Sequence, residues 1–304
     1  METVLTSGTE EGLIYGFMAL GILLSFRMLG FPDLTVEGCF PFAAGVAATL
    51  LVAGASPPVA TIVAVLSGIV AGLIAGAIHT RLGINNILAG ILVASALYTA
   101  QLRTMGRPNV PLLNYDTIYG QALGFLGLTE SRWGNIAFLA MLTLIVGGAL
   151  FWFLHTDLGL AVRATGDNEI MVRSLGVDVR DTKMITLALG NGLVALSGAL
   201  AAQEQGFADV SMGIGTLVAA AAAVVIGETV LGQGGVGRSL LSAVLGSIAY
   251  RALLAFGLRL GFPATDFKAV AAVLVLLALV APQLRNRWRE TVTRRAVARG
   301  GAAT

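Results

Sequence analysis

One apolar stretch occurs twice in the chain, and it constrains the fold more than any other feature. Residues 13–36 read LIYGFMALGILLSFRMLGFPDLTV, and residues 189–212 read LGNGLVALSGALAAQEQGFADVSM. At a constant offset of 176 residues, eight positions are identical: Leu13/Leu189, Gly16/Gly192, Ala19/Ala195, Leu20/Leu196, Leu24/Leu200, Gly30/Gly206, Phe31/Phe207 and Asp33/Asp209. Apolar composition explains some Leu, Ala and Gly matches, but not the shared Gly-Phe-x-Asp. A duplicated apolar segment that runs into a polar break is typical of transporters built from two related halves.

The composition places the chain in a membrane. Hydrophobic residues make up 56% of it, charged residues only 12%, and the mean hydropathy is +0.85. The 39 glycines suit helices that pack closely in lipid, where small residues let backbones approach. The net charge of +2 says nothing about nucleic acid, and we expect no nucleic-acid partner. The single cysteine, Cys39, excludes an internal disulfide. These values exclude a soluble domain.

Long apolar segments predict an all-α, polytopic membrane protein with about 8–10 transmembrane helices, since a span needs about 20 apolar residues. The candidates lie near 12–29, 36–54, 58–78, 84–102, 135–154, 184–203, 213–230, 238–257 and 266–282. Pro41 and Glu37 interrupt the second candidate, which we therefore expect to be kinked or a half-helix. We expect one permease domain over 1–304, with a first half at 12–154, a polar segment at 155–183, a second half at 184–283 and a basic tail at 284–304.

Arginine and lysine set the expected orientation. The tail carries Arg285, Arg287, Arg289, Arg294, Arg295 and Arg299, and the positive-inside rule therefore places it in the cytoplasm. Counting back through the spans places 155–183 in the cytoplasm as well and the N-terminus outside. The two copies of the repeat then run in opposite directions, so the repeat is inverted. This scheme places Asp33 near the inner face and Asp209 near the outer face, and it leaves Arg103, Arg107 and Arg132 outside.

The polar segment 155–183 predicts two short helices. Thr156 or Asp157 is placed to cap a helix that begins at LGLAVRA, and Gly166-Asp167-Asn168 reads as a break. A second helix of about EIMVRSL ends at Gly176. Two interpretations follow from the residues alone: a rigid knob that docks a soluble partner, or an interfacial helix lying on lipid headgroups.

A set of spaced residues in this segment resembles the cytoplasmic coupling segment of ABC-importer permeases of the branched-chain amino acid/ribose type. The matching residues are Gly159, Arg163, Ala164, Gly166, Asn168 and Gly176. The stretches PDLTVEG at 32–38 and VIGETVLGQGGVG at 225–237 also resemble that family, although Glu228 stands where the family usually has glycine. FPDLTVEG, NNILAGI at 85–91 and GFADVSMGIG at 206–215 are similar to its tryptophan/tyrosine transport permeases.

The resemblance implies the membrane-spanning permease of a bacterial ABC importer in the inner (plasma) membrane. It implies an ABC ATPase subunit that binds ATP and magnesium, with no cofactor in this chain. It further implies an extracytoplasmic solute-binding protein received by outer loops such as 103–134 and 205–212, and a second permease copy. The cargo it implies is an amino acid or a related small solute, with aromatic amino acids as the first guess. A stand-alone secondary transporter or channel is the alternative, since inverted repeats permit it equally.

Polar residues at the helix breaks are the candidate lining of the translocation path: Asp33, Thr35, Glu37, Gln203, Glu204, Asp209 and Ser211. Asp33 and Asp209 read as helix N-caps, and Glu37 either caps its helix or contacts solute. Glu204 either lines a vestibule or faces solvent. Arg251 either extends to the interface or pairs with an acid such as Glu228.

Other chemistry finds no support in the sequence. The run GQGGVGRS at 232–239 approaches a phosphate-loop spacing, but a nucleotide site requires a preceding β-strand, and both flanks here are apolar spans. We interpret it as a tight turn between helices. His79 and His155 have no second ligand at metal spacing, and no catalytic triad or carboxylate pair is present, so we expect neither a metal site nor an enzyme.

Overall fold

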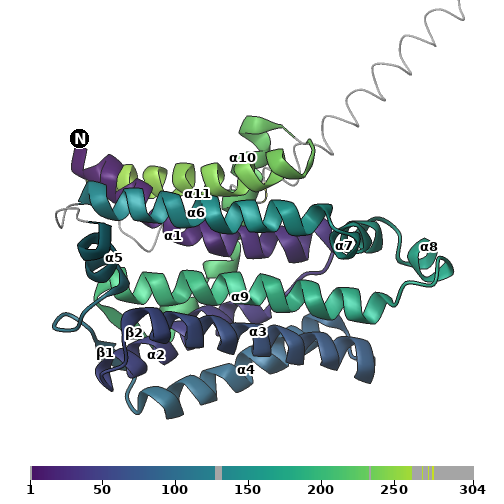
Figure 1. Cartoon of the computed structure of the whole chain (residues 1–304), viewed down its shortest axis with the longest axis horizontal. Coiled ribbons are helices and arrows are strands. Elements are labelled where there is room, and N and C mark those ends of the chain that lie inside the picture. The colour runs from purple at the N-terminus through teal and green to yellow at the C-terminus, as the bar shows by residue number, and fades with distance from the viewer. Residues whose placement is uncertain are drawn as a thin grey trace, which may run out of the picture.

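The computed structural model describes residues 2–126, 132–232 and 234–261, together with Ala269, Val273 and Leu276. Its helices lie roughly parallel in a bundle (Figure 1). Eight of them are long and apolar enough to span a membrane. These eight match the first eight predicted segments, and the ninth, near 266–282, lies almost wholly outside the described residues, as does the tail at 284–304.

The elements follow one another along the chain in this order: α1 (Glu2–Ile22) with the π-helical turn η1 (Leu23–Met28), α2 (Thr35–Val52), α3 (Pro57–Leu82), α4 (Asn86–Met105), β1 (Asn109–Pro111), α5 (Ile118–Leu126), α6 (Arg132–His155), α7 (Asp157–Asp167), α8 (Glu169–Ser174), α9 (Val179–Gln205), β2 (Phe207–Asp209), the 3₁₀ turn η2 (Val210–Gly213), α10 (Thr216–Leu231) and α11 (Val236–Arg259). The predicted all-α class is confirmed, with one short antiparallel strand pair. In that pair Asn109 lies opposite Asp209.

Helix α9 occupies the centre of the bundle and packs against α1, α2 and α3. Small residues permit this contact. A Cβ at Gly72 would overlap the Leu187 carbonyl, and one at Gly198 would overlap the Phe40 carbonyl. Because lipid chains are as apolar as leucine, such close backbone packing is a main source of helix association in a membrane. The glycines therefore hold the core together in this protein.

The crossing of α1 and α9 has the symmetry of the repeat. Gly21 lies against the carbonyl of Gly190, and Ser197 donates a hydrogen bond to the carbonyl of Ile14 at 2.8 Å. These two contacts are equivalent under the offset of 176, because Gly21 corresponds to Ser197 and Ile14 corresponds to Gly190. The two copies therefore cross in opposite directions about a pseudo-twofold axis, which confirms the predicted inverted repeat.

The shared Gly-Phe-x-Asp forms the break in each copy. Gly30 and Gly206 occupy equivalent positions, and both have positive φ, +65° and +75°, which only glycine adopts without strain. After each break the chain turns back and starts a short helix, α2 of 18 residues and α10 of 16 residues. Glu37 and its equivalent Gly213 touch where the two short helices begin.

Two sequence expectations about the first break are corrected. Helix α2 is continuous through Pro41 and is not broken there. Asp33 does not lie at the inner face, because its carboxylate accepts a hydrogen bond of 2.6 Å from Asn191, which is halfway along α9. The residues between η1 and α2 carry the chain back into the bundle. Asp33 is consequently buried in the core, only 1% exposed.

We predict that Gly21→Ala destabilises the bundle, because the added Cβ overlaps the Gly190 carbonyl and overpacking of this kind costs about 1–3 kcal/mol. Gly148→Ala is the matched control, since nothing lies within 4 Å of a Cβ there and alanine favours a helix. Thermal unfolding of both variants in detergent checks this. An unchanged midpoint for Gly21→Ala would contradict the tight crossing.

Candidate functional site: the α7–α8 segment

The predicted pair of short helices exists and projects from one end of the bundle (Figure 1). Thr156 caps α7 by accepting a hydrogen bond from the Gly159 amide, as the sequence predicts. Asn168 separates the helices and caps α8 by accepting a 3.0 Å bond from the Met171 amide. Gly176 follows α8 with φ of +83°. Each of these residues has a local role in shaping the segment.

Two glycines fix α7 to the bundle. A Cβ at Gly159 would overlap Phe153 and Leu154 at the end of α6, and one at Gly166 would overlap the Met28 carbonyl. Met28 ends η1, so α7 rests directly on the first helix break. Arg27, the residue before it, pairs with Glu228 of α10 at 2.9 Å. The segment is thereby connected to both η1 and α10.

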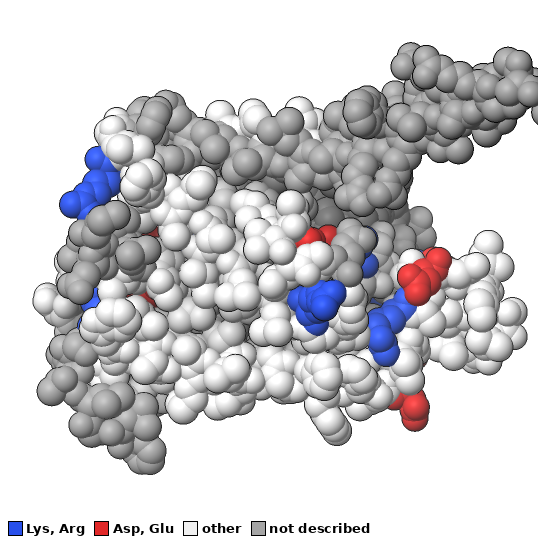
Figure 2. All heavy atoms as spheres, turned by 90° about the horizontal axis from the view of Figure 1, so that it is seen from above, with Lys and Arg blue, Asp and Glu red and all other residues white. Residues whose placement is uncertain are grey.

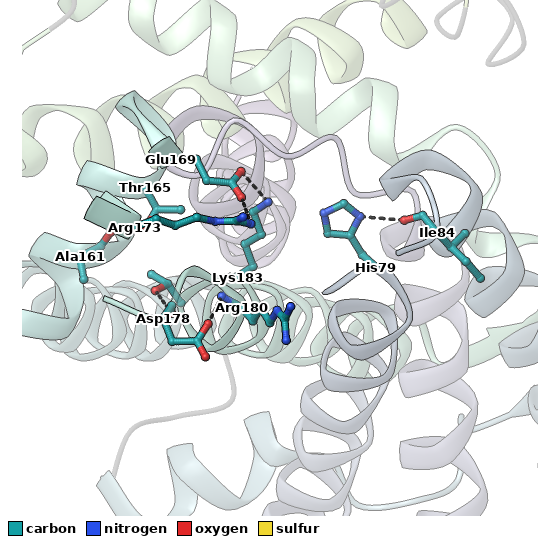
Figure 3. Close-up of polar contacts among 10 residues, drawn as sticks. His79, Ile84, Ala161, Thr165, Glu169, Arg173, Asp178, Arg180 and Lys183 are labelled. Carbon is teal, nitrogen blue, oxygen red and sulfur yellow. Dashed lines mark hydrogen bonds and ion pairs between the residues drawn. The ribbon is translucent and has the colours of Figure 1, made fainter. Parts of the chain in front are cut away.

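Glu169 attaches α8 to α9 (Figure 3). Its carboxylate accepts from Lys183 at 2.8 Å and from Arg173 at 2.7 Å, one helical turn along α8. The hydrogen bond from Lys183 is the main reason that the pKa of Glu169 lies below its ordinary value. The Glu169/Arg173 spacing is visible in the sequence. Lys183 is fourteen residues away in the chain and was not identified as a partner.

The segment exposes several large apolar side chains. Ile170 is 83% exposed and Leu175 is 69% exposed, and Met171 and Leu158 are exposed beside them. Ala164 is exposed as well, whereas Arg163 is half-buried and its Nε has no hydrogen-bond partner among the described residues. Large side chains presented together outside a folded core usually mark a contact surface. On the face shown in Figure 2, the charged side chains of the described residues lie toward the two ends of the bundle, with an uncharged band between them.

The predicted helix-break residues divide into three groups. Glu37, Asp209 and Ser211 line one pocket. Asp33 and Thr35 are buried, and the Asp33 carboxylate accepts a 2.9 Å bond from the Thr35 amide. The N-cap position of α2 is Leu34, however, so the prediction that Asp33 is the N-cap is wrong. Gln203 and Glu204 lie at the far end of α9.

Gln203 is 3% exposed, donates to Thr61 and accepts from the Ile118 amide, so its amide group joins α3 and α5 to α9. This role differs from the predicted lining of a path.

Asp209 caps η2 by accepting from the Ser211 amide, as predicted, and the Ser211 side chain also holds the pKa of Asp209 below its ordinary value. Arg251 pairs with Glu11 at 3.1 Å and lies 3.4 Å above the Tyr15 ring. The interpretation that Arg251 pairs with an acid is therefore confirmed, but the acid is Glu11. Glu228 lies at the opposite end of the bundle beside Arg27.

The eight apolar spans, the inverted repeat and the anchored surface segment define a multi-pass membrane permease. A family model described as the permease component of the branched-chain amino acid transport system matches residues 4–280. The chain belongs to this family, which confirms the resemblance to branched-chain amino acid/ribose-type ABC permeases. The family is one of transport permeases and not of enzymes.

The names of this chain's relatives refer to different transported solutes. It is 36% identical over 281 residues to a tyrosine transport system permease protein of Clostridioides difficile, with 92% of each chain covered. It is 31% identical over 278 residues to the galactofuranose transporter permease protein YtfT of Escherichia coli, covering 88% of this chain and 76% of that one. The solved structure of PsaBC from Streptococcus pneumoniae in complex with Fab aligns at a TM-score of 0.49 and 17% identity, over 91% of this chain and 90% of that one.

We predict that Glu169→Gln loosens α8, because it removes the charge that pairs with Lys183 and Arg173. A partly exposed pair contributes up to about 1 kcal/mol, so amide exchange over 168–176 should rise by up to about fivefold. Hydrogen–deuterium exchange with mass spectrometry measures this. Acidification should also loosen α8. Because the pKa of Glu169 is lowered in the folded state, its ion pairs stabilise α8 fully above the ordinary glutamate pKa. This stabilisation is lost as the pH falls through the lowered pKa.

Asp181→Asn is the control for this experiment. Asp181 is an exposed carboxylate in the first turn of α9 and forms no ion pair with any described residue. Equal exchange rates in both variants would show that the ion pairs do not hold α8 in place.

Proposed function

We propose that this chain is the permease subunit of an ABC importer that brings an amino acid, in the first instance an aromatic one, into the cell. A separate ATPase docks on the α7–α8 segment and supplies ATP hydrolysis with its own magnesium. A solute-binding protein delivers the cargo to the opposite end of the bundle, and two permease copies enclose the path. The tyrosine permease relative supports the choice of cargo.

The observation that carries this proposal is the position of α7. Its outer side belongs to an exposed apolar surface, and its inner side, at Gly166, lies on the carbonyl of Met28 at the first helix break. The break continues through Leu29 and Phe31, which pack on Leu187 of α9. A displacement of α7 by a docked ATPase therefore acts directly on the break. The Arg27–Glu228 ion pair carries the same displacement to α10.

The proposed orientation places the α7–α8 end in the cytoplasm and the strand pair outside. Helix α1 starts at the strand-pair end and α9 runs in the opposite direction to it (Figure 1). Arg163, Arg173, Arg180 and Lys183 lie in or beside the α7–α8 segment. These basic residues support the orientation under the positive-inside rule. Asp33 and Asn191 then lie near the middle of the membrane.

We predict that Ile170→Asp abolishes ATPase binding, because it places a charge in the middle of the apolar docking surface. Leu113→Asp is the matched control. The two side chains are equal in size and similarly exposed, 83% for Ile170 and 84% for Leu113. Leu113, however, lies in the loop after β1 at the other end of the bundle. Co-purification of the cognate ATPase with Ile170→Asp should fall by about tenfold or more, the size of an interface hot-spot effect, and remain normal with Leu113→Asp.

Tyrosine uptake into proteoliposomes is the second measurement. Uptake should require the ATPase, ATP and the binding protein together. Uptake by the permease alone would establish the alternative, a stand-alone secondary transporter, and equal ATPase capture by both variants would exclude α7–α8 as the docking surface.

A further inference from the structure

We propose that the pocket between α2, α4 and η2 is a binding site for a primary ammonium group attached to an aromatic body. This inference rests on the proposed importer function and names the chemistry of the solute in its path. The pocket has a volume of about 570 Å³, which suits a small organic molecule. It lies where the two repeat copies meet, since Glu37 and its equivalent Gly213 both line it.

The pocket presents hydrogen-bond acceptors. Glu37 extends from the first turn of α2 and forms no ion pair with any described residue. Asp209 adds a carboxylate on the opposite wall, although Asn109 and Ser211 already donate to it.

Gln101 provides an independent indication of a ligand. Its side chain is 0% exposed and lines the pocket, yet its Oε1 accepts no hydrogen bond from any described residue. A buried acceptor without a donor costs about 1–3 kcal/mol, and a ligand N–H removes that cost. An ammonium group carries three donors and a positive charge, which matches Gln101 Oε1 and the Glu37 carboxylate together.

The rest of the pocket suits a flat apolar body. Tyr98 presents its ring from α4 and is 53% exposed, while Pro108 and Ile214 form apolar walls. Tyr98 and Glu37 line the same pocket, so a ring packed against Tyr98 and an amine at Glu37 can belong to one solute. An unpaired carboxylate facing lipid is costly, so the open side of the pocket faces a water-filled path or a second copy. Sugars lack the cation that this arrangement selects.

Cysteine labelling tests the proposal, because Cys39 is the only cysteine in the chain and is completely buried. Ser95→Cys places a thiol in the pocket wall, and Leu113→Cys places one on an exposed loop as the control. Membranes containing the assembled transporter are treated with one of two thiol reagents. Aminoethyl methanethiosulfonate carries a primary ammonium group, and sulfonatoethyl methanethiosulfonate carries a negative charge. The permease is then purified and labelling is quantified by mass spectrometry.

We expect the cationic reagent to react with Ser95→Cys about tenfold faster than the anionic one, after correction for the ratio at Leu113→Cys. Adding Glu37→Gln should reduce this preference to the part that the Asp209 carboxylate supplies, and Glu37→Asp should retain most of it. Tyramine should slow the labelling, and its deaminated analogue 3-(4-hydroxyphenyl)propanoate should not. Gln101→Leu, which preserves the buried volume, should weaken protection by tyramine.

Several results would overturn the proposal. These are equal reactivity with both reagents, a preference that Glu37→Gln does not reduce, protection by the propanoate, or no protection by tyramine. Labelling requires no ATPase activity, so each of these results leaves the importer function standing. Conversely, normal ATPase capture by Ile170→Asp would contradict the proposed docking surface and leave the chemistry of the pocket intact.

Discussion

The close crossing of α1 and α9 is the contact on which the rest of the structure depends. Gly21 against Gly190 and Ser197 against Ile14 bring the two longest repeat helices together about a pseudo-twofold axis. Because lipid offers no hydrophobic drive for helices to associate, this backbone proximity has to stabilise the pair. Helices α2 and α3 then pack on α9, and α11 packs on α1. The segments that follow the two breaks touch at Glu37 and Gly213 as a consequence.

Equivalent breaks have acquired different surroundings. Asp33 is buried and bonded to Asn191, whereas Asp209 lies beside Asn109 and Ser211 at the end of the bundle. The residue equivalent to Asn191 in the first copy is Tyr15, which lies beneath Arg251 instead of bonding to Asp209. The repeat thus preserves the backbone geometry of the break, while side chains from other helices give each copy its own polar environment. The pocket forms between these two unlike halves.

The fold was largely predictable, and the candidate site only in part. Apolar segments longer than a bilayer needs are recognised by length alone, and the caps at Thr156 and Asn168 act on amides two or three residues away. The contacts of Gln203 were not predictable, because its partners, Thr61 and the Ile118 amide, come from distant helices. Tyr98 and Gln101 were missed because nothing in α4 distinguishes a residue that faces the pocket from one that faces lipid. Pro41 was misread as a break because the loss of one backbone bond was given too much weight.

The sequence by itself determined that the chain spans a membrane, that its two halves are related, and that a capped polar segment separates them. Those properties depend on composition, on identity at a fixed offset and on short-range hydrogen bonding, and all three can be read from the amino-acid sequence. Only the tertiary structure decided that Asp33 is buried at mid-helix, that α7 rests on Met28, and that Glu37 and Gln101 face one pocket. Each of these three features depends on which helices pack together. Helix packing depends on how small residues fit at the helix crossings, and no short stretch of sequence reveals that fit.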